Sequence, residues 1–139
     1  MESFAAALLL GIVSGLRTFT AVAALWLLRH TGPVAYGLGV AALLEYLGDL
    51  HPNAPARTAA PGLIARIFAG AFCGWAVTSA AAASPIAGAL LGACGALIGA
   101  YGGLAVRVRL IALIGKVPAA ILEDAVAIAG AVAIVLYTT

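Results

Sequence analysis

The stretch FAAALLLGIVSGLRTFTAVAALWLL (residues 4–28) decides the fold class, because it is a long apolar segment that contains only one charge. A helix rises about 1.5 Å per residue, so these roughly 25 residues exceed the ~30 Å hydrocarbon core of a bilayer. A secretory signal would also be apolar, but Met1, Glu2 and Ser3 supply no basic leader, and the segment is longer than a signal core. We therefore expect a retained membrane helix with Arg17 near its centre.

The composition also indicates a chain that is embedded in a lipid bilayer. Of the 139 residues, 65% are hydrophobic and 9% are charged, whereas a soluble domain has about 25% charged residues. This length favours a single domain over residues 1–139. The net charge of +2, with no basic run, argues against nucleic acid as a partner. Cys73 and Cys94 lie in apolar segments without a C-x-x-C pair, so we expect small buried residues and neither a metal site nor a cofactor.

Four further apolar segments are expected to form helices, over residues Pro33–Leu50, Leu63–Ala83, Ile86–Val106 and Ala119–Tyr137. The proline-rich stretch DLHPNAPARTAAPG (residues 49–62) is expected to be the longest loop. The link RVRLIALIGK (residues 107–116) carries three positive charges around an apolar centre, which predicts a short interfacial helix. The predicted fold is all-α, a polytopic transmembrane helix bundle of about five spans.

The distribution of positive charge predicts an orientation. The second and fourth loops carry Arg57, Arg107, Arg109 and Lys116, whereas the first carries only Arg29 and the third carries none. Positively charged loops are retained in the cytoplasm. We therefore expect a bacterial inner-membrane protein with its N-terminus inside and its C-terminus outside. An even number of spans would fit only if one segment were re-entrant.

Small residues recur at spacing four, which allows helices to approach closely. The stripe of Gly95, Gly99 and Gly103 is expected to pack against another helix rather than face lipid. The complete set of expected packing positions is Gly11, Gly15, Gly88, Gly92, Gly95, Gly99 and Gly103.

Five ionisable residues lie within the predicted spans, where an unpaired charge costs at least ~2.5–3.5 kcal/mol. They are the candidate substrate- or ion-binding residues Arg17, Glu45, Asp49, Glu123 and Asp124. The predicted topology places the four acids at similar depth, where Arg17 can pair with one of them. Glu45 is the preferred partner and Glu123 the second, because the other two lie closer to the interface. These residues form either ion pairs that pin three helices together or a polar cavity that binds a cation or proton.

Two patterns in the sequence are typical of transporters. Ser14-Gly15-Leu16-Arg17-Thr18 combines glycine, hydroxyls and a charge at mid-span, which indicates either a broken helix or a glycine packing face beside a paired arginine. Gly11-x-x-x-Gly15 is echoed by Gly99-x-x-x-Gly103, which predicts a weak inverted repeat whose two helices run antiparallel.

Soluble catalytic motifs such as G-x-S-x-G, H-E-x-x-H and the Walker loop are absent from the sequence. The leading hypothesis is a small transporter or channel-like permeation protein, a homo-oligomer in contact with membrane lipids, which binds a small ion or small molecule. The alternatives are a structural or assembly membrane protein without a substrate and an intramembrane lipid-modifying enzyme that uses Glu123 and Asp124.

Three motifs carry a resemblance to a known family. They are Ser14-Gly15-Leu16-Arg17-Thr18-Phe19, then Glu45-Tyr46-Leu47-Gly48-Asp49-Leu50-His51-Pro52 followed by Ala56-Arg57-Thr58, and finally Leu122-Glu123-Asp124-Ala125-Val126-Ala127-Ile128. In this order they resemble a family of small bacterial membrane proteins catalogued as domain of unknown function 4126. The resemblance covers nearly the whole chain. It implies a bacterial inner-membrane protein and adds weight to the same charged residues, but it implies no substrate.

Overall fold

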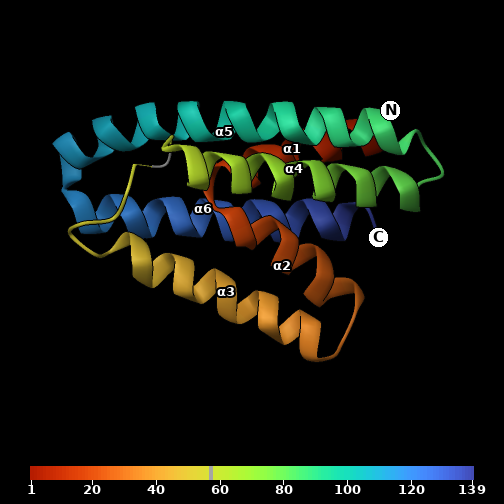
Figure 1. Cartoon of the computed structure of the whole chain (residues 1–139), viewed down its shortest axis with the longest axis horizontal. Coiled ribbons are helices and arrows are strands. Elements are labelled where there is room, and N and C mark those ends of the chain that lie inside the picture. The colour runs from red at the N-terminus through yellow and green to blue at the C-terminus, as the bar shows by residue number, and fades with distance from the viewer. Residues whose placement is uncertain (57) are drawn as a thin grey trace.

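The computed structural model describes residues 1–56 and 58–139, and in these ranges all regular structure is helical. The six helices are α1 (Glu2–Leu16), α2 (Thr18–Arg29), α3 (Pro33–Asp49), α4 (Ala60–Ala80), α5 (Pro85–Ile114) and α6 (Lys116–Tyr137) (Figure 1). The predicted all-α class is thus confirmed. Arg57, which contributed to the predicted loop charge, lies outside the described residues.

Three helices, α4, α5 and α6, are long and apolar enough to cross a membrane. The prediction of five spans was therefore wrong on two counts. The first apolar segment is divided at Arg17 into two shorter helices. The second forms α3, whose 17 residues measure about 25 Å, less than the ~30 Å of a hydrocarbon core.

The link at residues 107–116 is the C-terminal part of α5 and not a separate interfacial helix, which corrects the prediction. No glycine or proline separates Arg107 from Ile114, so α5 continues for 30 residues, or about 45 Å. Gly115 then ends the helix with φ of +90°, a conformation that favours glycine. Arg107 and Arg109 therefore lie on α5, whereas Lys116 is the first residue of α6.

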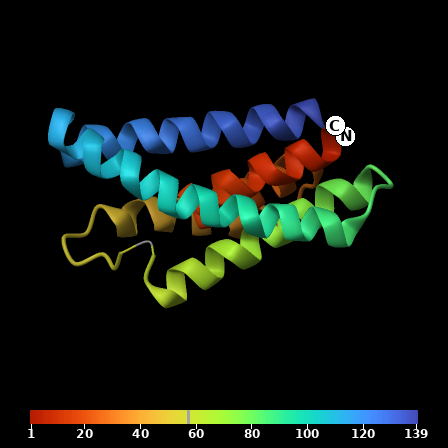
Figure 2. The same cartoon turned by 90° about the horizontal axis from the view of Figure 1, so that it is seen from above.

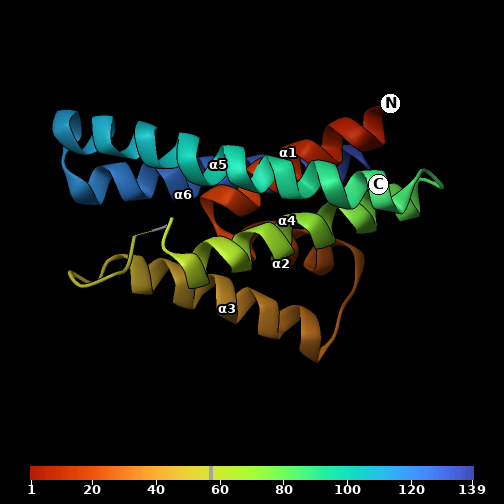
Figure 3. The ribbon, with the colours of Figure 1, turned by 45° about the horizontal axis from the view of Figure 1, so that its top comes forward.

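The first segment folds back on itself as a helical hairpin, so the predicted break is present. At the beginning of α1, Glu2 lines the same cavity as Tyr137 of α6. At the bend, Arg17 is paired with Asp124 in the first half of α6. At the end of α2, Arg29 Nη2 donates a hydrogen bond of 3.2 Å to Thr138 Oγ1. Hence α1 runs inward and α2 returns to the same end of the bundle (Figures 1 and 3).

This hairpin places both chain termini at one end of the molecule (Figures 1 and 2), which we call the terminal end. The opposite end, with the loop residues 50–56 and 58–59 and the turn at Gly115, is the loop end. The predicted N-inside, C-outside arrangement would place the termini on opposite sides of a membrane, whereas the bundle has both at one end. The orientation of the chain in a membrane stays a prediction. The N-terminus lies at the terminal end, whereas the basic stretch of residues 107–116 lies at the loop end.

The helices approach each other closely at glycines, as predicted for most of the seven packing positions. A Cβ at Gly11 or Gly15 of α1 would overlap the backbone of α5, and one at Gly95 or Gly99 would overlap the backbone of α1. On another face of α5, the backbones of Gly88 and Gly92 approach α4 equally closely. The packing prediction is confirmed for these six positions. The seventh, Gly103, is half-buried and lines a groove.

The inverted repeat predicted from the glycine spacing is wrong. Gly11 meets Gly92, and Gly15 meets Ala96 and Gly99, so residue numbers increase together along the two helices. The helices α1 and α5 are therefore parallel, whereas inversion requires them to be antiparallel.

Candidate functional site

The break in the first helix is stabilised by a carboxylate from another helix. Arg17 has extended backbone angles, φ −142° and ψ 114°. The next two backbone N–H groups, those of Thr18 and Phe19, donate to Glu45 Oε1 at 2.7 Å and to Oε2 at 3.0 Å. In a continuous helix these groups would bond to the carbonyls four residues earlier. Glu45 therefore caps the N-terminus of α2, where the helix dipole favours a negative charge.

The Arg17 side chain is fully buried and lies between carboxylates of two helices. Its Nη1 is 2.5 Å from Asp49 Oδ2 on α3, and its Nη2 pairs with Asp124 on α6. The guanidinium carbon also lies 5.1 Å from the centre of the Tyr46 ring, within the range of a cation–π interaction. The prediction that Arg17 pairs with an acid of these two segments is confirmed. The choice of Glu45 as the preferred partner was wrong, because its carboxylate accepts hydrogen bonds from backbone N–H groups and lies one turn away from Asp49.

Two further arginines join this site, and sequence reasoning did not include them. Arg107 Nη1 lies 3.2 Å from Asp49 Oδ2 and 3.2 Å from Glu123 Oε2, and Arg66 Nη2 lies 3.7 Å from Glu45 Oε1. Arg107 was assigned to a loop. The sequence signal that could have placed Arg107 in a helix is the apolar helix pattern, which continues without interruption on both sides of this residue.

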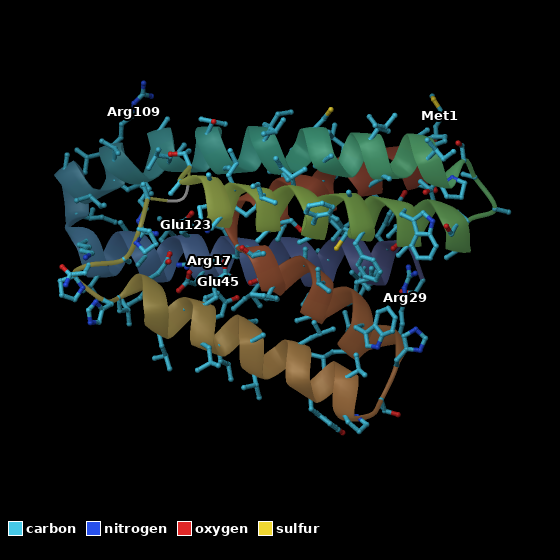
Figure 4. The ribbon with its side chains drawn as sticks, in the orientation of Figure 1. Met1, Arg17, Arg29, Glu45, Arg109 and Glu123 are labelled. Carbon is cyan, nitrogen blue, oxygen red and sulfur yellow. The ribbon has the colours of Figure 1, made fainter. Side chains whose placement is uncertain are left out.

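We call the seven side chains the charge cluster: Arg17, Glu45, Asp49, Arg66, Arg107, Glu123 and Asp124. They come from α3, α4, α5, α6 and the bend of the hairpin. Figure 4 shows Arg17, Glu45 and Glu123 close together beside the start of α2. The cluster contains four of the chain's five acidic residues and, within the described part of the chain, has one more carboxylate than guanidinium. The five predicted site residues thus lie together in space.

Two adjoining cavities reach the charge cluster from the loop end. The larger, about 530 Å³, is lined by Glu45, Asp49 and Arg66 together with residues of the loop that precedes α4. The smaller, about 160 Å³, is lined by Asp49, Arg107, Lys116 and loop residues. Asp49 lines both cavities. A solute at the loop end therefore has polar groups to contact on its way to the buried part of the site.

A hydrogen-bonded pair closes the cluster on the side of the terminal end. The Thr20 hydroxyl oxygen and the Tyr46 hydroxyl oxygen lie 2.6 Å apart and share a hydrogen bond. Beyond this pair, an apolar cavity of about 200 Å³ lies between α2, α3 and α6, and both residues line it. The pair joins α2 to α3 and separates the polar cavities from the apolar one.

The remaining candidates lie away from the charge cluster. His51 Nδ1 accepts a hydrogen bond of 3.3 Å from the Asn53 backbone. Cys73 is buried as predicted, whereas Cys94 is exposed on α5, which corrects the expectation that both are buried. In the described ranges, no group of three or more His, Cys, Asp or Glu side chains is arranged to hold a metal ion.

Comparison with protein-family models, with curated proteins and with solved structures gives no match. The resemblance carried by the three sequence motifs stays a prediction.

Proposed function

We propose that this chain is a small permeation protein of the bacterial inner membrane that moves a small cation or proton through the charge cluster. The observation that carries the proposal is the helix break at Arg17, next to a cavity lined by Glu45 and Asp49. Broken helices surround substrate sites in many transporters, because unwound backbone and helix ends offer polar groups inside the bilayer. Ionisable residues at this depth are costly, which also favours a functional role.

The charge of the larger cavity favours a cation over an anion. Its charged lining residues within the described ranges are Glu45, Asp49 and Arg66, so carboxylates outnumber the guanidinium. Asp49 is 22% exposed, whereas Arg17 is 0% exposed. An arriving ion would therefore meet a carboxylate first.

The two sides of the site differ, as alternating access requires. Two cavities with charged residues in their lining lead from the loop end to Asp49, whereas the contact between Thr20 and Tyr46 closes the other side. Passage would require this contact to open. The loop end carries Arg107, Arg109 and Lys116, so positive charge favours a cytoplasmic loop end and two external termini.

A homo-oligomer remains part of this proposal. Helix α3 packs chiefly on α2 and buries only Ala35 and Ala42 among its side chains. A second copy placed against α3 would complete the wall of the larger cavity, which α3 and α4 line from one side.

The runner-up is a structural membrane protein without a substrate, and one observation favours it. The carboxylates of the charge cluster already have partners inside the molecule: guanidinium groups for Asp49, Glu123 and Asp124, and backbone N–H groups together with Arg66 for Glu45. Such contacts would pin α3 and α6 to the hairpin without any ion passing.

A flux assay separates the two functions. Purified protein in liposomes is exposed to a gradient of protons, Na⁺ or K⁺, and each gradient is followed by an enclosed dye that responds to that ion. We expect one of these gradients to collapse faster than in protein-free liposomes, and Asp49→Asn to remove most of the difference. Cys94→Ala, on the exposed face of α5, is the matched control and should leave flux unchanged. If all three gradients persist as they do in protein-free liposomes, the permeation proposal is wrong and the structural function is favoured.

A further inference from the structure

An apolar groove of about 550 Å³ runs between α5 and α6 with α1 as its floor. Ile12 and Leu16 form the floor, and Ile98, Val106, Leu122 and Val126 line the walls. Along α5 the groove extends from Ile98 to Leu110, twelve residues or about 18 Å. One leaflet of a bilayer has a hydrocarbon thickness of about 15 Å. The groove thus has the length of a single lipid chain.

Glycine keeps this groove open. Gly99 packs directly against the backbone of α1. A Cβ at Gly102, in contrast, would have no other atom within 4 Å. Gly102 therefore lines the groove without being needed for helix contact. A larger side chain at this position would enter the groove and leave the bundle undisturbed.

The groove is charged at one end only. The ion pair of Arg107 with Glu123, 3.2 Å apart, lines it near the loop end. Two exposed cations lie farther toward that end, Arg109 on α5 and Lys116, which also lines the smaller cavity of the loop end. Arg109 follows Gly102 by seven residues and Val106 by three, so it lies on the same flank of α5. Figure 4 shows Arg109 extending outward from the bundle. Neither exposed cation has an ion-pair partner in the described part of the chain.

A second copy of the chain is poorly suited to neutralise these cations. Four of its five acidic residues belong to the charge cluster. The fifth, Glu2, lies at the terminal end. These two exposed cations are therefore available to another molecule, one that has a negative charge and an apolar part that fits the groove.

We propose that this groove binds an anionic phospholipid, with one acyl chain over Gly102 and the phosphate headgroup at Arg109 and Lys116. Apolar grooves between transmembrane helices that end at basic side chains bind anionic headgroups through the same combination of chemistry. The lipid chain contributes the apolar contact, and the phosphate contributes the charge that the protein lacks at this place.

The test is native mass spectrometry of the full chain released from detergent with equal amounts of phosphatidylglycerol and phosphatidylcholine of identical acyl chains. Each cation near a membrane surface contributes enough to favour the anionic lipid, and two together give roughly a 30-fold preference, or about 2 kcal/mol. We expect the wild type to retain one phosphatidylglycerol per chain. The double variant Arg109→Ala, Lys116→Ala should lose the preference and retain the two lipids equally.

Gly102→Leu should lose retention of both lipids, because its side chain fills the groove. Gly37→Leu is the matched control, since a Cβ at Gly37 also has no neighbour within 4 Å but lies on α3, and it should retain lipid as the wild type does. Equal retention of the two lipids by the wild type would overturn the proposal, as would undiminished retention by Gly102→Leu. Loss of a dimer in Gly102→Leu with unchanged lipid retention would instead assign the groove to a second copy. If Gly102→Leu fails to fold, the charge variant decides the question alone.

Discussion

Replacing Arg17 with methionine removes the central charge of the cluster and keeps an unbranched side chain of similar length. The two carboxylates that contact Arg17 are affected unequally. Asp124 loses the one ion-pair partner that it has in the described part of the chain, whereas Asp49 keeps Arg107 at 3.2 Å. The structure therefore predicts a stronger energetic coupling of Arg17 to Asp124 than to Asp49.

The expected magnitude follows from burial. Breaking a buried ion pair by removing one partner costs about 3–5 kcal/mol. Arg17 is 0% exposed, but Asp49 and Asp124 are 22% and 24% exposed, so water can solvate the carboxylates that are left. We expect Arg17→Met to lower the free energy of unfolding by about 3 kcal/mol. The coupling energy should be about 2 kcal/mol with Asp124→Asn and about 1 kcal/mol with Asp49→Asn.

The measurement is a pair of double-mutant cycles, with unfolding by sodium dodecyl sulfate in mixed micelles followed by circular dichroism. Arg109→Met is the matched control, because Arg109 is exposed, and it should change the unfolding free energy by less than about 0.5 kcal/mol. Additive effects in both cycles would refute the ion pairs. A larger coupling with Asp49 than with Asp124 would refute the arrangement of partners described above.

Three further predictions concern the bend, the helix contacts and the termini. Glu45→Ala removes the carboxylate cap of α2 and should lower the unfolding free energy by about 1–2 kcal/mol, whereas an unchanged value in the same titration would mean that the cap contributes nothing. Gly74→Ala should destabilise the bundle by about 1–3 kcal/mol, because its Cβ would overlap the backbone of α5; Gly37→Ala, which meets no neighbour, should be neutral or stabilising, and equal effects of the two would contradict the packing. In a variant without native cysteines, Ser3→Cys and Thr139→Cys should react with an impermeant maleimide from the same side of the membrane, and reaction from opposite sides would contradict the hairpin.

The gathering of charges could be predicted from the sequence, because the cost of a charge in hydrocarbon limits where it can lie. Arg17 at mid-segment needs carboxylates, and almost all of the chain's carboxylates lie in two later segments. The positions of these carboxylates within the two segments predicted that they lie at a similar depth. The choice among Glu45, Asp49 and Asp124 did not follow, since it depends on which turn of α3 faces the bend.

The broken first helix and the direction of α1 depend on contacts between distant residues. Residues 4–28 contain no proline, and the break is stabilised by Glu45, which lies on a different helix. Spacing of glycines identifies a packing face but is the same for parallel and antiparallel neighbours. The sequence pattern therefore predicted close packing of Gly95 and Gly99 correctly and gave the wrong direction for the partner helix.

The packing of α1 on α5 also constrains the order in which the parts of the protein fold. Gly11 meets Gly92 and Gly15 meets Gly99, so the surface that receives the hairpin is synthesised long after the hairpin itself. Glu45, which caps the bend, is likewise still to come when residues 4–28 emerge from the ribosome. Until then, an isolated Arg17 within an apolar segment would be costly in hydrocarbon. The hairpin is thus translated before the helices that it packs on, and its final shape waits for them.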